Sequence, residues 1–147
     1  MNSWKYADKM KYLNPIDDEF FKKMAEDKNF CQEVLRIVME DPALTVQELI
    51  PQNSVKNLQG RSVVLDSFCK TSDNEHCNIE VQKENDDDHL RRIRYNGSCI
   101  TVNITNTGSK FKQVPDVCVI FISRSDIFKG NHPLYHVDSV IRETGEI

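Results

Sequence analysis

Hydrophobic positions recur with a helical period at the start of this chain. Phe20, Phe21 and Met24 follow the capping candidates Asp17 and Asp18, which predicts a helix that ends near residue 27. A second helical pattern lies between residues 29 and 42, with an asparagine as the expected N-cap and a proline that stops the helix. We therefore expect two short helices before any strand.

The period then changes to two, which is typical of strands. Residues 61–70 are rich in β-branched and apolar side chains, and residues 77–83 alternate cleanly between apolar and polar. The polar segment 71–75 between them is typical of a tight turn, so the two strands are expected to form an antiparallel hairpin. A short strand at residues 54–58 is a further candidate, because Pro51 and Asn53 interrupt the segment before it.

A longer helical pattern spans residues 88–104. Its expected buried stripe consists of Leu90, Ile93, Gly97, Ile100 and Ile104. On the other side and flank of this helix lie Arg91, Arg92, Tyr95 and Arg94. The nearly continuous apolar run Val117–Ser123 predicts a strand buried on both faces. Residues 126–147 show no strong period until Val137–Ile141. The whole order predicts an α/β fold with a mixed β-sheet.

Bulk composition limits the class of protein. Hydrophobic residues make up 39% and charged residues 29%, as in an ordinary globular domain. No run of about 18 apolar residues predicts a membrane span. The first fifteen residues carry charges and no apolar core, which argues against a secretory signal. The net charge of −4 counts against a large nucleic-acid interface but allows a local basic patch.

The five cysteines suggest thiols rather than disulfides or zinc ligands. They are odd in number and never form C-x-x-C, and three lie inside apolar runs. We expect buried free thiols in a reducing cytoplasm, with Cys69 and Cys77 as neighbours across the hairpin turn.

Polar residues in the predicted hairpin are the candidates for chemistry. Glu80 and Gln82 stand two residues apart on one face of the second strand, and Asp66 lies in the first. If Asp66 faces the same side, two carboxylates and an amide converge, and such oxygen ligands suit Mg²⁺ or Mn²⁺. From the pattern alone the alternative stays open that Asp66 caps a strand end while the other two form a solvated face.

Several ordered segments resemble one family. They are NLQGRSVVLDSFCK (57–70), NIEVQ (78–82), RRIRYN (91–96), VPDVCVIFISRSDIFKG (114–130) and PLYHVDSVIRETGE (133–146). An early D-x-x-F-K element adds to them at Asp18–Lys22. The chain is similar throughout to the PD-(D/E)XK nuclease family transposases, which are related to recombination-promoting nucleases. The resemblance implies a restriction-endonuclease-like core of order α-β-β-β-α-β, a mixed sheet with helices on both faces.

The resemblance also implies roles for individual residues. Asp66, Glu80 and Gln82 match the catalytic positions of the family. Asp66 and Glu80 would hold Mg²⁺ or Mn²⁺, with Asp18 on the first helix as an auxiliary carboxylate. The R-x-R-Y element is matched by Arg92, Arg94 and Tyr95, which would contact nucleic acid together with Lys22. For these cationic side chains the alternative is a solvated face, with the arginines paired to Asp86–Asp88.

Two departures from the resemblance matter. The wider superfamily usually has lysine where this chain has Gln82, so a positive charge near the reacting phosphate must come from elsewhere, with Arg92, Arg94 or a second metal as candidates. Relatives of this kind also usually extend further. We expect a tail at residues 1–16 and a single nuclease-like domain at 17–147 that lacks the family's C-terminal part.

Two functional hypotheses follow. The first is a divalent-metal-dependent DNA endonuclease of a transposase and recombination family. We expect it to be cytoplasmic, to bind DNA and no membrane, and to have a homodimer as its candidate oligomer. The alternative is a catalytically degenerate nuclease fold that binds nucleic acid or itself. A complete transposase that also joins strands is the least supported, because one short chain shows no end-recognition module.

Overall fold

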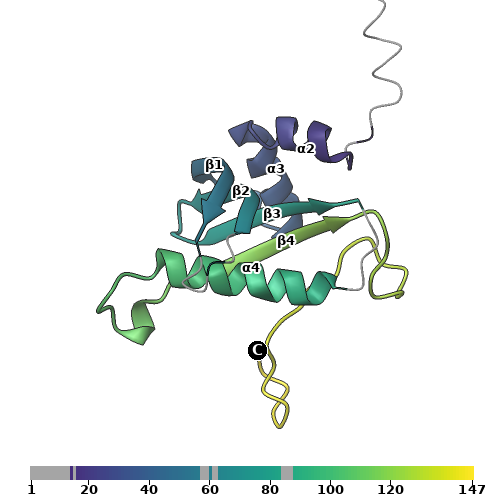
Figure 1. Ribbon diagram of the computed structural model, residues 1–147. Helices are drawn as coiled ribbons and strands as arrows, with labels where there is room; N and C mark the ends of the chain where they lie inside the picture. Colours follow the sequence, from purple (N-terminus) through teal and green to yellow (C-terminus); the bar gives the residue numbers. More distant parts are fainter. Residues whose placement is uncertain (1–13, 15, 57–59, 61–62, 84–87) are drawn as a thin grey trace, which may run out of the picture.

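A four-stranded mixed sheet forms the centre of the molecule, with helices on both of its faces (Figure 1). The computed structural model describes residues 14, 16–56, 60, 63–83 and 88–147. The helices are α2 (Asp18–Met24), α3 (Lys28–Val38), α4 (His89–Ile104) and the short η1 (Phe111–Gln113). The strands are β1 (Val46–Val55), β2 (Val63–Thr71), β3 (His76–Gln82) and β4 (Val117–Ser123), in that order across the sheet.

The predicted hairpin and the predicted crossover are both confirmed. β2 and β3 pair antiparallel, with Cys69 opposite Cys77, and the turn between them places Asn74 at a φ of 66°. β3 and β4 pair parallel, as strands joined by a helix do, and α4 is that connection. The observed order is therefore the α-β-β-β-α-β core that the family resemblance implies.

Two hydrophobic cores lie on opposite faces of the sheet. The first core, between the sheet and the pair α2 and α3, contains buried Phe21, Ala25, Cys31, Leu35, Leu44, Val46, Cys69, Cys77, Ile79, Val81 and Ile120. The second core, between the sheet and α4, is smaller and contains buried Val55, Leu65, Phe68, Cys99 and Ile100. Figure 1 shows α2 and α3 on one side of the strands and α4 on the other. The fold is thus a three-layer sandwich with unequal outer layers.

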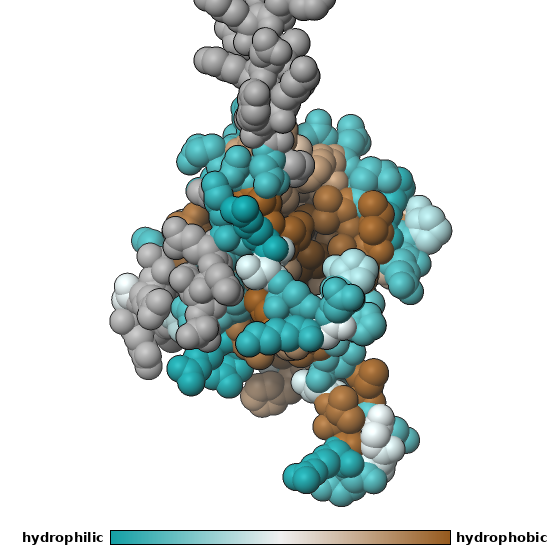
Figure 2. Space-filling model, turned by 90° about the vertical axis from the view of Figure 1, so that its right-hand side faces the viewer, coloured by the Kyte–Doolittle hydropathy of each residue, from teal (hydrophilic) through white to brown (hydrophobic). Residues whose placement is uncertain are grey.

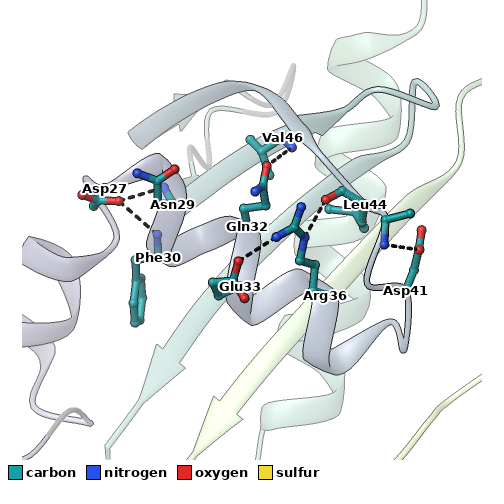
Figure 3. A network of polar contacts seen from close by, with 10 residues as sticks. Asp27, Asn29, Phe30, Gln32, Glu33, Arg36, Asp41, Leu44 and Val46 are labelled. Carbon is teal, nitrogen blue, oxygen red and sulfur yellow. Dashed lines mark hydrogen bonds and ion pairs between the residues drawn. The ribbon is translucent and has the colours of Figure 1, made fainter.

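Helix α3 is capped and tied to β1 by a polar network (Figure 3). The carboxylate of Asp27 accepts the backbone N–H groups of Asn29 and Phe30, so Asp27 is the N-cap and the predicted cap at Asn29 is wrong by two residues. Gln32 accepts the backbone N–H of Val46, and Arg36 donates to the carbonyl of Leu44 at 2.8 Å. These bonds satisfy backbone groups in the connection and set where β1 begins.

Strand β1 is longer than the short strand predicted at 54–58. It begins at Val46 and passes through Pro51, which faces Ser67 of β2. Proline cannot donate a ladder hydrogen bond, and an edge strand is the place where a sheet tolerates it. β1 is such an edge strand, so Pro51 does not break it. Residues 57–59, like the predicted strand start at 61–62, lie outside the described residues.

The prediction that Val117–Ser123 is buried on both faces is wrong in one respect. β4 has α4 on one face and the first core on the other, but it forms the second edge of the sheet. Only Ile120 of this strand is buried, and the other residues are half-buried. An apolar run cannot by itself distinguish an edge strand from a central one, because both pack against helices.

The stripe predicted on α4 needs a similar correction. Leu90 is 51% exposed, whereas His89, Asn96, Cys99 and Ile100 are buried. The buried face is therefore rotated toward polar residues, which a purely hydrophobic criterion overlooks. None of the helices in the described part of the chain combines the length and the apolar composition that crossing a bilayer requires.

Beyond β4, the chain extends away from the sheet past α4 (Figure 1). Asp126 organises its first part, since this carboxylate accepts three backbone N–H groups and the hydroxyl of Tyr135. Further along, Val137, Val140 and Ile141 are all more than half exposed. In Figure 2 the projecting segment carries apolar atoms beside polar ones. Residues 124–147 form no helix or strand, consistent with their weak periodicity.

All five cysteines are free thiols, and four of them are buried while Cys118 is half-buried. Cys69, Cys77 and Cys118 occupy one row across β2, β3 and β4 on the face of the first core. They act there as small apolar side chains, which confirms the expectation of buried thiols.

Candidate active site

The candidate site lies where β2 and β3 face α4, and Asp66 is placed there by a break in the alternation of β2. Leu65 is buried in the second core, whereas Ser67 contacts the first core through Cys31 and the carbonyl of Ala25. In a regular strand residues 65 and 67 would share a face. Asp66 therefore sits at a reversal of the two faces.

The neighbouring edge strand shows the same irregularity. β1 and β2 pair on both sides of this point, with Pro51 opposite Ser67 and Asn53 opposite Leu65. Between them Gln52 adopts a φ of 51°, a left-handed conformation that is uncommon outside glycine and asparagine. Because of this local distortion the Asp66 carboxylate turns toward β3 and accepts the backbone N–H of Val81 at 3.1 Å.

Glu80 is a buried acid, only 9% exposed, in the middle of β3. Its Oε1 accepts the Asn78 amide at 2.7 Å and the Asn96 amide of α4 at 3.4 Å. The pKa of Glu80 is raised to about 7, mainly by burial and also by the negative charge of Asp66. Hydrogen bonds from Asn78 and the Asp66 backbone and the charge of Arg92 act in the lowering direction. The two acids are thus close enough to repel.

Gln82 lies at the end of β3 and contacts α4. Its Oε1 accepts a hydrogen bond of 2.9 Å from Nη1 of Arg92. Nη2 of Arg92 also meets Asp88 at 3.5 Å, which confirms one of the ion pairs considered for this helix. Asp86 and Asp87, the other acids considered, lie outside the described residues.

A cavity of about 680 Å³ opens between α4 and the strands. Its walls include Glu80, Arg91, Arg92, Arg94, Tyr95 and Asn96. Arg91 and Arg94 are exposed, whereas Arg92 and Tyr95 are half-buried. Although the chain is acidic as a whole, the wall of this cleft therefore holds three guanidinium groups, one of them paired with Asp88, beside a buried carboxylate. Such a surface fits phosphate groups.

Two further predicted site residues belong to α2. Lys22 is half-buried on α2, on the sheet face opposite α4. Asp18 begins α2, which packs against β3, but its side chain lies outside what the structure describes. The metal role of Asp18 and the nucleic-acid role of Lys22 stay predictions.

The structure adds two residues that sequence reasoning did not single out, Asn78 and Asn96. Both donate to Glu80 from buried positions. Asn78 shares the polar face of β3 with Glu80, and Asn96 stands four residues after Arg92 on the same face of α4. These spacings were available in the sequence, but amides at such positions are common and point to a site only beside a buried acid.

The oxygen-rich site fits a divalent cation. The half-buried Asp66 and the buried Glu80 repel each other here, and a cation would relieve that repulsion. The Oδ1 atom of Asn78 is also buried without a hydrogen-bond partner, next to Glu80. Within the described ranges no three or more His, Cys, Asp or Glu side chains gather to hold a metal by themselves. Two carboxylates completed by water are a normal set for Mg²⁺.

Comparison with known proteins shows the class. The family model of the PD-(D/E)XK nuclease family transposases matches residues 15–146, so the chain belongs to that family. Membership supports a nuclease-type function, implies a DNA substrate, and agrees with the restriction-endonuclease-like sheet. PD-(D/E)XK nucleases generally use divalent metals. No curated protein and no solved structure matches the chain.

Proposed function

We propose that this protein is a DNA endonuclease that hydrolyses phosphodiester bonds with Mg²⁺ or Mn²⁺. The observation that carries the proposal is the buried Glu80 in the wall of an arginine-lined cleft, with the half-buried Asp66 close enough to repel it. A buried acid with a pKa shifted by desolvation and a second acid is a common sign of a reaction centre.

The residues of the site would have different roles according to where they lie. Asp66 and Glu80 would hold the cation, which would supply a hydroxide near neutral pH and neutralise charge on the phosphate. To hold a cation Glu80 would have to be deprotonated, because a carboxylate binds metal in its charged form. Asn78 and Asn96 hold the Glu80 carboxylate in place. Arg91 and Arg94, exposed on the cleft wall, would grip the DNA backbone, and Tyr95 would stack on a sugar or base.

Plasmid nicking tests this proposal. Wild type should nick DNA with Mg²⁺ or Mn²⁺, while Asp66→Asn and Glu80→Gln should lose nearly all activity. Matched controls are Asp73→Asn in the β2–β3 turn and Glu48→Gln on β1, both exposed acids. Asp18→Asn and Lys22→Ala in the same assay test the auxiliary carboxylate and the additional cationic contact that belong to this proposal.

Thermal unfolding gives a second, independent readout. A cation that binds only the native state stabilises it by about 2.7 kcal/mol at a hundred times its Kd. Mn²⁺ should therefore raise the Tm of wild type and of both control variants, but not that of Asp66→Asn. Equal nicking by wild type and the two site variants would mean that the activity belongs to another site or to a contaminant.

One observation favours a second candidate, a fold kept for binding DNA without cutting it. Gln82 replaces the usual lysine and has its carbonyl oxygen engaged by Arg92. That candidate requires no metal-linked rise in Tm and no nicking, but retains DNA binding through the arginines of α4. The two assays above separate the alternatives.

A further inference from the structure

The contact between Arg92 and Gln82 joins α4 to the last residue of β3. Nη1 of Arg92 lies 2.9 Å from Oε1 of Gln82, a normal length for a charge-assisted hydrogen bond. Arg91 and Arg94 share the cleft wall but are exposed, whereas Arg92 is half-buried. Arg92 is therefore the arginine that the fold presses against the site.

This contact determines which way the Gln82 amide points. A guanidinium group carries donors and no acceptor, so it meets the carbonyl oxygen of an amide and never its NH₂. With Oε1 engaged by Arg92, the NH₂ of Gln82, on the other side of the carbonyl carbon, points away from the guanidinium group. A positive charge on the carbonyl side also polarises the amide, which strengthens its N–H groups as donors.

Arg92 is itself held in position. Asp88, four residues earlier on the helix, forms an ion pair with Arg92, with its carboxylate 3.5 Å from Nη2. Its charge is also felt at Glu80, where it lowers the pKa of the buried acid. The guanidinium group thus stands within electrostatic reach of a proposed metal ligand and in contact with Gln82.

We infer that Arg92 is a positioning residue that turns Gln82 into a fixed, positively backed hydrogen-bond donor. The two side chains together take the role that a single lysine has in most of the superfamily. Lysine offers donors and a charge, and the pair offers the same from two elements of the fold. Gln82 would donate to the oxygen that carries the developing negative charge at the reacting phosphate. This inference rests on the proposed function and assigns the charge that the site otherwise lacks.

The simpler interpretation is that Arg92 only ties α4 to β3 or adds one more phosphate contact. A structural tie would affect stability, and a phosphate contact would affect DNA affinity. A positioning role affects the cleavage rate at saturating DNA. The three effects are measured separately.

Single-turnover cleavage at saturating DNA tests the role. Arg92→Ala should cleave about a hundredfold more slowly, the order of loss seen when one transition-state donor is removed. Arg94→Ala should weaken DNA binding and keep most of the rate at saturation. Arg142→Ala removes the same charge from an exposed position in the C-terminal segment and should match wild type. Comparable Tm values would show that the variants are folded.

Lysine substitution gives a sharper test, because its effect should change sign with the background. In Arg92→Ala, adding Gln82→Lys supplies donors and charge in one side chain and should recover cleavage at least about tenfold. In the presence of Arg92, Gln82→Lys places two cations together and should slow cleavage. A structural tie predicts no such rescue, since lysine cannot restore the lost contact.

Nuclear magnetic resonance tests the geometry without metal or DNA. The side-chain NH₂ signals of Gln82, assigned by their loss in Gln82→Glu, should be well resolved in wild type and in Arg94→Ala. In Arg92→Ala they should shift, because the guanidinium group no longer holds and polarises the carbonyl oxygen. Unchanged signals in Arg92→Ala would overturn the proposed contact.

The outcomes separate the inference from the function on which it rests. Wild type that nicks DNA while Arg92→Ala nicks equally well overturns the inference alone. Wild type without metal-dependent nicking overturns the proposed function and the catalytic part of the inference with it. Slow cleavage by Arg92→Ala, rescue by Gln82→Lys and shifted amide signals in Arg92→Ala together support it.

Discussion

The two faces of β3 are both shielded from solvent, but one is apolar and the other is polar. Toward α2 and α3 the strand presents Cys77, Ile79 and Val81, which are buried among apolar side chains. Toward α4 it presents Asn78 and Glu80, which are buried just as deeply. One strand thus separates an apolar core from a face with buried polar side chains. Burying a carboxylate costs free energy unless the group is paired or binds a metal, so the second face is the one suited to binding.

Buried polar atoms that lack a hydrogen-bond partner strengthen this contrast between the two faces. In the described part of the chain four buried side-chain atoms have no hydrogen-bond partner: His76 Nδ1, Asn78 Oδ1, His89 Nδ1 and His89 Nε2. All of them lie on the α4 side, where His76 stacks on Phe68 and His89 packs against Phe121. Each unsatisfied group costs roughly 1–3 kcal/mol. The α4 face is therefore the less stable one, as expected for a site that takes a ligand.

The largest effect should come from the apolar face. Ile79→Ala leaves a cavity in the first core and should lower the free energy of unfolding by about 3 kcal/mol. Ile37→Ala on α3, where the side chain is 73% exposed, should change it by less than about 0.5 kcal/mol. Urea denaturation measures both. A loss at Ile79 no larger than at Ile37 would show that this face does not dominate stability.

Replacing the buried acid on the polar face, Glu80→Gln, should raise the free energy of unfolding at high pH when no metal is present. Because the pKa of Glu80 is raised from its ordinary value of 4.5 to about 7, the folded state holds a proton there that the unfolded state has lost. Stability should therefore fall as pH rises between these values, by up to about 3 kcal/mol.

Chelator-treated protein shows whether this holds. The unfolding free energy of wild type should decrease from pH 5 to pH 8, and that of Glu80→Gln should change far less, so the variant becomes the more stable protein at pH 8. Glu48→Gln provides the control. Parallel pH profiles for wild type and Glu80→Gln would mean that the pKa of Glu80 is the same in the folded and the unfolded protein, and that the polar face carries no electrostatic cost.

The smallest effect concerns DNA affinity. Arg94→Ala should weaken binding several-fold and reduce the slope of log K against log salt by about 1, as the loss of one phosphate contact does. Lys23→Ala, an exposed cation on α2 across the sheet, should leave both unchanged. Fluorescence anisotropy at several salt concentrations measures these slopes. Equal slopes for the two variants would show that DNA has no preference for the α4 face.

The elements themselves were largely predictable from local pattern. The hairpin and the helix after it were located within about two residues, because alternation and helical periodicity are properties of neighbouring residues. The N-cap of α3 was misplaced because Asp27 and Asn29 are both good caps and local sequence does not separate them. Strand β1 was underestimated because Pro51 breaks a central strand but not an edge strand.

The candidate site was predictable in its residue types but not in its arrangement. The pair Glu80 and Gln82 could be placed on one face of a strand, whereas the orientation of Asp66 was left as a condition. Its orientation depends on a reversal of β2 beside the left-handed Gln52 of another strand. The sequence also treated Arg92 and Arg94 alike, and only packing against β3 distinguishes them.

The sequence by itself determined the family, the order of helices and strands, and the carboxylates available for chemistry. The tertiary structure decided that Glu80 is buried, that Asp66 turns toward β3, and that Arg92 rather than Arg94 engages Gln82. The physical reason is range. Hydrophobic periods and motifs act over a few neighbouring residues, whereas desolvation, charge repulsion and hydrogen bonds between β2, β3 and α4 arise only after distant segments pack together.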